Sequence, residues 1–261
     1  MRTAVGALDA LAPIGLEALV DHAELMTRVD RKYVVGLDEL GTLLSGVPVG
    51  TRVLEIDGRR EFGYRSTYLD TPDRRSFLTS GRSHRHRWKV RGRVYLETGG
   101  SWLEVKTAGP RGRTVKQRMV HAVRLEDGLS AEGRAFVTPI VGPEVTCALT
   151  PVLVTAYRRT TLLLPRSGAR VTIDVDLDWT SMTSGDAIVS RRLAIVETKT
   201  GSTPSPVDRQ LWARGHRPVR LSKFGVGMAA LHPELPRLKW HRALERHLSF
   251  PIRSTPRGVT P

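Results

Sequence analysis

The sequence predicts a mainly β fold (α+β), in which antiparallel strands form a barrel flanked by helices. From Thr27 to about Lys199, runs rich in β-branched and aromatic residues alternate apolar and polar positions, which is the period of a half-buried strand. Clusters of glycine, proline, aspartate and serine separate these runs. Helical spacing of apolar residues dominates only near the two ends of the chain. Strands are therefore expected to form most of the domain.

The elements follow in chain order. Residues 1–25 are expected to form an N-terminal helical segment, because apolar residues recur at helical spacing between Ile14 and Leu25. Strands are predicted at residues 27–35, 51–57, 61–69, 85–97, 101–107, 112–126, 151–164, 169–179 and 190–199. Gly99 and Gly100 separate two of them at hairpin spacing, which favours antiparallel pairing. Eight or nine strands are enough to close a barrel.

Short helices are predicted between the strands and at the C-terminal end. The first three span residues 37–44, 73–79 and 131–137, and the last three span 206–214, 222–231 and 236–248. We expect the main domain at residues 26–232. A C-terminal helix and a disordered tail rich in proline and arginine are expected within residues 233–261.

The charge of the chain indicates an anionic partner. Lysine and arginine number 41 against 26 aspartates and glutamates, which gives a net charge of +15. Such a field attracts nucleic acid, anionic membranes and phosphorylated small molecules alike. The single cysteine, Cys147, excludes an intramolecular disulfide and a zinc site made of cysteines, and we expect it to be a buried small side chain. No run approaches about 18 apolar residues, so we expect a cytoplasmic protein without a membrane span.

Alternating charge marks the strand predicted at residues 85–97. Cationic side chains occupy four alternate positions of it: Arg87, Lys89, Arg91 and Arg93. The positions between them are apolar or glycine. Side chains two residues apart on a strand lie about 7 Å from each other, so these charges repel unless an anion offsets them. A solvated outer face or a guarded sheet edge can carry the same pattern.

The same alternation recurs on other predicted strands. Charged side chains share a face in the sets Arg28, Asp30 and Lys32; Glu104 and Lys106; Lys116 and Arg118; Arg170, Asp174 and Asp176; and Glu197 and Lys199. Apolar residues occupy the opposite faces, where helices can cover them. This recurrence favours an inside-out barrel with a charged, water-filled lumen, because unpaired ions are costly to bury.

An excess of cations with a minority of carboxylates suits a polyphosphorylated substrate. Arginine and lysine bind phosphate oxygens, and carboxylates bind the Mg²⁺ or Mn²⁺ that bridges phosphates. The sequence has no Walker loop, kinase glycine-rich loop or HExxH motif.

The ordered motifs resemble the VTC domain, the polyphosphate polymerase branch of the triphosphate tunnel metalloenzymes, which are CYTH-like. The similar segments are 28–33, 68–71, 87–93, 103–106, 114–118, 157–160, 170–174, 196–199 and 222–224. The resemblance implies an eight-stranded antiparallel β-barrel tunnel that binds the triphosphate of ATP with basic residues and a metal. Asp30 stands where this family more often has glutamate, so its carboxylate reaches less far. The chain also lacks the SPX region and membrane helices of eukaryotic relatives.

The resemblance assigns roles by position. Catalytic residues that neutralise charge on the transferred group would be Arg91, Arg93, Lys199 and Lys223. Substrate-binding residues would be Lys32, Lys89, Lys106, Lys116, Arg118, Arg159 and Arg170. Glu197 would hold the metal. Glu104, Asp174 and Asp176 are either helpers that act through water or members of lumenal ion pairs.

The leading functional hypothesis is transfer of the γ-phosphoryl group of ATP to a growing polyphosphate chain, with release of ADP. Mn²⁺ or Mg²⁺ is the expected cofactor, and ATP and inorganic polyphosphate are the expected partners. The first alternative is hydrolysis of tripolyphosphate, a nucleoside triphosphate or thiamine triphosphate in the same tunnel. A further alternative is a polyanion or nucleic-acid binder without catalysis, but the sequence shows no recognition module for nucleic acid.

Overall fold

The computed structural model describes residues 2–21, 29–109, 114–122, 124–248 and 251–253. The chain folds into two compact units. The first comprises Met1–Gly63, Tyr157–Leu177 and Ser190–Arg220, and the second comprises Tyr64–Ala156, Asp178–Val189 and Leu221–Pro261. Two long strands, β8 (Thr150–Leu164) and β9 (Ala169–Ser181), contribute residues to both units.

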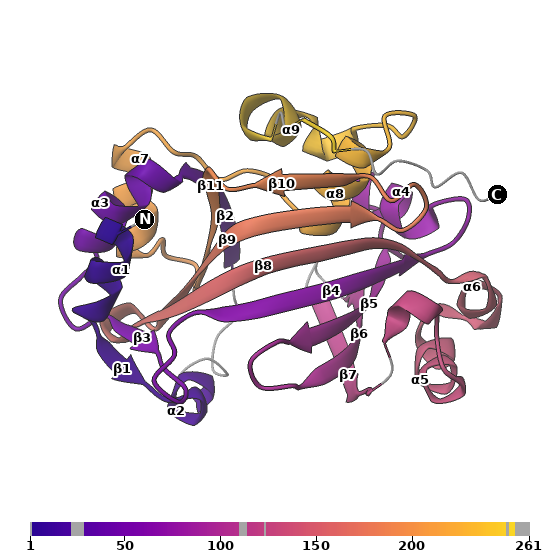
Figure 1. Cartoon of the computed structure of the whole chain (residues 1–261), viewed down its shortest axis with the longest axis horizontal. Helices are drawn as coiled ribbons and strands as arrows, with labels where there is room; N and C mark the ends of the chain where they lie inside the picture. Colours follow the sequence, from indigo (N-terminus) through magenta and orange to yellow (C-terminus); the bar gives the residue numbers. More distant parts are fainter. Residues whose placement is uncertain (1, 22–28, 110–113, 123, 249–250, 254–261) are drawn as a thin grey trace, which may run out of the picture. The chain divides into compact units, whose positions relative to one another are not determined.

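The first unit is a sheet with helices packed on its apolar side. Its strands follow the order β2-β11-β9-β8, with β2 at Val29–Gly36 and β11 at Leu193–Thr200. The short strands β1 (Ala12–Ile14) and β3 (Arg52–Leu54) pair in parallel, and β3 also pairs with β8. The helices are α1 (Arg2–Asp9), α2 (Leu16–Asp21), α3 (Leu37–Ser45), the 3₁₀ helix η3 (Pro165–Ser167) and α7 (Pro206–Ala213). Helix α3 contacts both α1 and α7 (Figure 1).

The second unit is a meander of antiparallel strands. The order β8-β4-β5-β6-β7 uses β4 (Phe62–Asp70), β5 (Trp88–Tyr95), β6 (Ser101–Ala108) and β7 (Thr114–Val120), and β10 (Ala187–Ser190) pairs with β9. Its helices are α4 (Arg75–Gly81), η2 (Leu125–Asp127), α5 (Ala131–Val141), α6 (Pro143–Ala148), α8 (Lys223–Leu231), η4 (Leu238–Trp240) and α9 (His241–His247). Helix α5 packs beside α6 and on β6 (Figure 1). Gly99 has φ +68° in the turn from β5 to β6, where an amino acid with a side chain would be strained.

The mainly β class with antiparallel strands and flanking helices is confirmed. Eight strands follow one hydrogen-bonded order, from β2 to β8 in the first unit and from β8 to β7 in the second. Closure differs from the prediction: within the residues that the structure describes, β2 and β7 end this order, so no ladder closes the sheet into a barrel. Backbone pairing of end strands is decided by distant parts of the chain, which strand patterning alone cannot specify.

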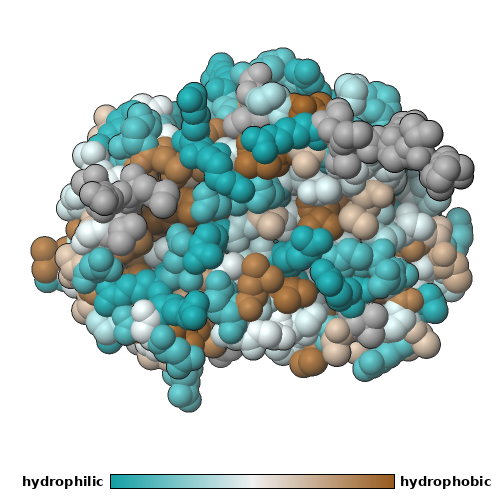
Figure 2. Space-filling view, in the orientation of Figure 1, coloured by the Kyte–Doolittle hydropathy of each residue, from teal (hydrophilic) through white to brown (hydrophobic). Residues whose placement is uncertain are grey.

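The apolar faces of the strands are buried under helices in each unit, as the alternation predicts. In the first unit, Tyr33, Val171 and Val196 belong to one core with residues of α3 and α7. In the second, residues of β5 and β6 form a core with η2, α5 and α6. Gly92 lets η2 approach β5 closely, because a Cβ added at this position would lie 2.9 Å from the Leu125 side chain and would have to displace it. The surface visible in Figure 2 is mostly hydrophilic, with hydrophobic atoms in small separate patches.

Several local predictions need correction. The helix expected over residues 14–25 is limited to α2, because Ile14 belongs to β1 and is buried in register with Leu54; residues 22–28 lie outside the described residues. The strand expected at residues 190–199 begins later, at Leu193 of β11, because Ser190 is the last residue of β10; α6 was not predicted. Cys147 is exposed on α6, since only Val145 and Thr146 of that helix are buried.

The C-terminal region is partly described. Arg253 exchanges backbone hydrogen bonds of 2.8 and 2.9 Å with Ala187, so this part of the predicted disordered tail has a fixed partner. Residues 249–250 and 254–261 lie outside the described residues. No helix among those that the structure describes is long and apolar enough to cross a lipid bilayer.

Candidate active site

The first unit holds a lysine–glutamate cluster on β2 and β11, composed of Asp30, Lys32, Glu197 and Lys199. The register places Lys32 opposite Glu197 and Asp30 opposite Lys199. Glu197 Oε1 accepts hydrogen bonds from Lys199 Nζ at 2.7 Å and from Lys32 Nζ at 3.1 Å. Lys199 Nζ also donates to Asp30 Oδ2 at 3.2 Å. Two carboxylates therefore orient one ammonium group at the centre of the cluster.

Glu197 is held in its charged form. Burial acts to raise its pKa, but the neighbouring charges of Lys32 and Lys199 outweigh burial and hold the pKa of Glu197 well below its usual range. The charge of Arg159 acts in the same direction. Glu197 is thus an anion at neutral pH, as a metal ligand must be.

Arg159 and Asp174 form a fork-like ion pair in the same unit. Arg159 donates from Nε to Oδ1 at 2.6 Å and from Nη2 to Oδ2 at 2.8 Å, and the Asp174 side chain is only 1% exposed. Both oxygens of this carboxylate are therefore bonded to one guanidinium. Arg170 lies opposite Lys199 in the register of β9 and β11, next to the lysine–glutamate cluster.

Asp176 has a different ion-pair partner from Asp174. Its φ of +51° is unusual for a residue of a strand. Its carboxylate lies 3.8 Å from Arg191 Nε, whereas the carboxylate of Asp174 is bonded to Arg159.

A buried aspartate on α7 supports the cluster from the apolar side. Asp208 is 0% exposed and accepts hydrogen bonds from Tyr33 Oη at 2.7 Å and from Thr198 Oγ1 at 2.6 Å. It also accepts from the backbone and side chain of Ser205, at 2.7 and 2.8 Å. Because Tyr33 follows Lys32 and Thr198 lies between Glu197 and Lys199, these bonds fix the strands that carry the cluster. Sequence reasoning missed Asp208, although Ser205 and Asp208 have the spacing of a helix capping box.

The second unit carries an arginine–lysine face across β5, β6 and β7. It is composed of Lys89, Arg91, Arg93, Glu104, Lys106, Lys116 and Arg118. One cross-strand row contains three lysines, in the register Lys89, Lys106 and Lys116. The next row contains Arg91, Glu104 and Arg118, so a single carboxylate sits among five neighbouring cations. Like charges this close on neighbouring strands favour binding of an anion.

Glu104 is the buried anion of this face. Its carboxylate is 1% exposed and accepts from Arg91 Nε at 2.7 Å and Nη2 at 2.5 Å, with Lys116 Nζ 3.7 Å away. Burial acts to raise its pKa, but Arg91, Arg93 and Lys116 lower the pKa of Glu104 to about 2. For Lys116, burial lowers the pKa, and the charge of Glu104 opposes that shift. Glu104 therefore acts as a fixed counter-charge, in agreement with the ion-pair role left open for it.

Two predicted lysines lie near the start of α8. Lys89 Nζ donates to Ser222 Oγ at 3.0 Å, and Ser222 caps α8 by accepting from the Gly225 backbone. Lys223 is the first residue of that helix, and its carbonyl accepts from the indole of Trp179 at 2.9 Å. The predicted motif at residues 222–224 is thus joined to β5 through Lys89.

Aromatic side chains share the arginine–lysine face, and sequence reasoning missed them. Arg91 donates from Nη1 to Tyr68 Oη at 3.2 Å, and Arg118 lies 4.4 Å from the centre of the Trp102 ring. The signal was present in the alternation, since Trp102 has the same parity as Glu104 on β6. Residues two apart on a strand lie on the same face, so Trp102 could have been assigned to the face of Glu104 if aromatic side chains had been considered together with charged ones.

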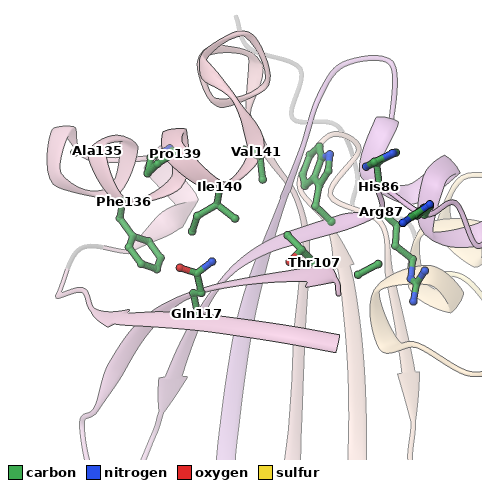
Figure 3. Close-up of a pocket in the computed structure, with 12 residues that line it drawn as sticks. His86, Arg87, Thr107, Gln117, Ala135, Phe136, Pro139, Ile140 and Val141 are labelled. Atoms are coloured by element: carbon green, nitrogen blue, oxygen red, sulfur yellow. The ribbon is translucent and has the colours of Figure 1, made fainter. Parts of the chain in front are cut away.

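A pocket of about 760 Å³ lies on the opposite side of β6 and β7, beneath α5. Figure 3 shows Phe136 and Ile140 of α5 directed toward Gln117 of β7.

Arg87 differs from the other three cations of the row predicted on this strand. It precedes β5, donates to the His84 carbonyl at 3.0 Å and lines the pocket beneath α5. None of the residues assigned to catalysis, substrate or metal lines it.

The carboxylates available for a metal are few. Within the described ranges, no group of three or more histidine, cysteine, aspartate or glutamate side chains is placed to hold a metal ion. Glu197, with Asp30 across Lys199, is the most suitable donor, because the carboxylates of Glu104 and Asp174 are engaged by arginine. Mg²⁺ commonly binds one or two carboxylates and takes its other ligands from water and substrate phosphates. The donor set therefore fits a metal that arrives with a phosphorylated substrate.

Comparison with known protein families gives a match to the VTC domain over residues 27–232. This chain belongs to the VTC domain family. The resemblance of the ordered motifs is thereby confirmed, and the lysine–glutamate cluster and the arginine–lysine face both lie inside the matched part of the VTC domain.

Solved structures and curated sequences were compared as well. A protein from Hippeastrum, with a dominant triphosphatase activity, is 12% identical at a TM-score of 0.49, covering 78% of this chain and 96% of its own. A Pyrococcus horikoshii protein is 12% identical at a TM-score of 0.47, covering 79% of this chain and 99% of its own. No curated protein sequence matches this VTC domain.

Proposed function

We propose that this VTC domain transfers the γ-phosphoryl group of ATP to the end of an inorganic polyphosphate chain and releases ADP. The observation that carries the proposal is the arginine–lysine face, where a row of three lysines adjoins a row of two arginines around Glu104. Glu104 offsets only one of the six positive charges of the face, so the face keeps a net positive charge that attracts phosphate oxygens.

The reaction needs charge neutralisation more than acid–base catalysis. A terminal phosphate oxygen of polyphosphate attacks the γ-phosphorus of ATP, the bond from that phosphorus to the β,γ-bridging oxygen breaks, and ADP leaves with the electron pair. The attacking oxygen is already anionic, so no base has to remove a proton. The cations allow two polyanions to approach each other and stabilise charge on the transferred group.

The roles of individual residues are carried over from the family resemblance. Arg91 and Lys223 of the second unit and Lys199 of the first are assigned to neutralising charge on the transferred group, and Arg93, beside the ring of Tyr64, is assigned to binding the substrate. Asp30 and Glu197 hold the Lys199 ammonium in place. Glu197 would hold Mn²⁺ or Mg²⁺, which when bound supplies further neutralisation of phosphate charge.

The state of the carboxylates favours transfer over hydrolysis. A base that activates water works best with a pKa near the operating pH. Burial and cations instead leave the pKa of Glu104 at about 2 and that of Glu197 well below its usual range. A triphosphatase would have to activate water with carboxylates that bind protons weakly.

The deciding experiment incubates the purified protein with ATP and Mn²⁺ and separates the products on a gel stained for polyphosphate. We expect long chains and an equal amount of ADP and transferred phosphate. Glu197→Gln should reduce chain synthesis by at least about 100-fold while ATP binding changes much less. Arg166→Gln, an exposed arginine of η3, controls for the loss of one charge in the same unit. Release of free phosphate without chains would replace the proposal by the triphosphatase, and full activity of E197Q would remove Glu197 from the metal site.

A further inference from the structure

We propose that the aromatic end of the arginine–lysine face binds the nucleobase of the nucleotide substrate. This inference rests on the proposed function, because it assigns a position to one part of ATP. The aromatic end is defined as Tyr64, Tyr95 and Trp102, with the guanidinium groups of Arg93 and Arg118. All five residues belong to the second unit.

The chemistry of the face changes row by row along the strands. Below the lysine row and the Arg91–Glu104–Arg118 row, the next cross-strand row contains Arg93 opposite Trp102, and Trp102 opposite Val120. The last row contains Tyr64 opposite Tyr95. Rows two residues apart are separated by about 7 Å along a strand. The face therefore passes from ammonium groups through guanidinium groups to aromatic rings.

The rings and guanidinium groups of this end contact one another. Tyr64 and Tyr95 meet edge to face, with 5.0 Å between ring centres. Arg93 lies 5.5 Å from the centre of Tyr64, and Arg118 lies 4.4 Å from the centre of Trp102. A Cβ added at Gly100 would meet Tyr95 at 3.4 Å and Trp102 at 3.6 Å, so these two rings flank the same short turn.

Apolar surface is also exposed at this end. Val120 of β7 pairs with Trp102 and lies on the same face of the strand as Lys116 and Arg118. Its side chain is apolar, yet the residue is 65% exposed. The rings of Tyr64, Tyr95 and Trp102 are only partly buried. A ligand that pairs a polyanion with a flat ring would cover this surface and neutralise the neighbouring rows at the same time. A nucleoside triphosphate has that composition.

The arrangement also sets the direction of the nucleotide. A base that lies against Tyr95 and Trp102 places the triphosphate toward Arg91 and the lysine row. An aromatic ring or an arginine side chain stacks on the flat face of a nucleobase, and every nucleobase has such a face. We therefore expect ATP and GTP to bind with similar affinity, and inorganic tripolyphosphate to bind without using the aromatic end.

The test compares two ligands on the same variants by isothermal titration calorimetry. Trp102→Leu and Tyr95→Leu should weaken ATP binding roughly tenfold or more, while the affinity for tripolyphosphate stays within about twofold of the wild-type value. Trp102→Tyr keeps a ring and should retain most of the ATP affinity. Phe136→Leu removes a partly buried ring from the other side of β6 and β7, and should change neither affinity.

The outcomes separate this inference from the proposed function. Unchanged ATP affinity in both leucine variants, or an equal loss for ATP and tripolyphosphate, overturns the aromatic site and leaves the phosphate site intact. Failure of the wild-type protein to bind either ligand overturns the proposed function, and this inference falls with it. Retained tripolyphosphate binding also shows that a variant is folded.

Discussion

The buried acidic side chains at the site each contact a cation. Glu197 contacts two lysines, Asp174 contacts Arg159, and Glu104 contacts Arg91. Buried ions without such partners would cost more free energy than these folded units could tolerate. The pairs explain how a strongly basic face can fold before any substrate is bound.

The pH dependence of stability tests the ion pairing of a single residue, Glu104. The pKa of Glu104 falls from 4.5 to about 2 on folding. A depressed pKa stabilises the folded state above the unfolded value, and this stabilisation is lost as the pH falls through the folded value. Between pH 6 and pH 3, we expect Glu104 to account for about 2 kcal/mol of lost unfolding free energy.

The measurement is urea unfolding of wild type and Glu104→Gln at both pH values. The difference in unfolding free energy between the two proteins should shrink by about 2 kcal/mol at the lower pH. Glu132→Gln, on the exposed side of α5, controls for the loss of one carboxylate. A difference that stays constant with pH would mean that Glu104 has no depressed pKa in the folded state.

At the scale of elements, each strand separates two environments. One face packs under helices and the other carries the charged residues, so a helix packed on the apolar face acts on the site through the strand between them. Helix α7 does so through Asp208, which bonds Tyr33 of β2 and Thr198 of β11. The geometry of Lys32, Glu197 and Lys199 thus depends on a side chain that does not contact them.

We expect Asp208→Asn to lower the unfolding free energy by about 2 kcal/mol, because charge-assisted hydrogen bonds from Tyr33 and Thr198 are weakened. The activity per folded molecule should also fall, with the KM for ATP rising, because the side chains of Lys32, Glu197 and Lys199 are positioned less firmly. Urea unfolding and steady-state kinetics measure the two effects. Asp38→Asn, an exposed aspartate in the first turn of α3, is the matched control. Loss of stability with unchanged KM would limit Asp208 to a structural role.

At the scale of the whole molecule, the net charge of +15 attracts both substrates from a distance. Salt screens this attraction, since the Debye length falls from about 10 Å at 0.1 M to about 3 Å at 1 M ionic strength. Polyphosphate carries more charge than ATP, so its binding should depend more steeply on salt.

We expect the KM for a polyphosphate primer to rise at least roughly tenfold between 0.1 and 1 M potassium chloride, and the KM for ATP to rise less. Initial rates at saturating concentration of the other substrate give both values. Circular dichroism over the same range shows that the fold is retained. An equal rise for both substrates would mean that the longer polyanion gains no additional attraction from the charge of the protein.

The sequence by itself determined the mainly β class and the side of each strand that carries charge. Alternation along a strand is a local property with a period of two, so Lys89, Arg91 and Arg93 could be assigned to one face without knowing their neighbours. The same rule failed at Arg87, which precedes β5 and lines the pocket beneath α5.

Only the tertiary structure decided which charges meet. The pairing of Glu104 with Arg91, of Glu197 with Lys32 and of Asp208 with Tyr33 depends on strand register and helix packing, which join residues far apart in the chain. The same register brought Trp102 and Tyr95 together at the end of the basic rows. Long-range packing, unlike periodicity, leaves no repeating pattern in the sequence, because each contact is fixed by the whole set of neighbours that pack around it.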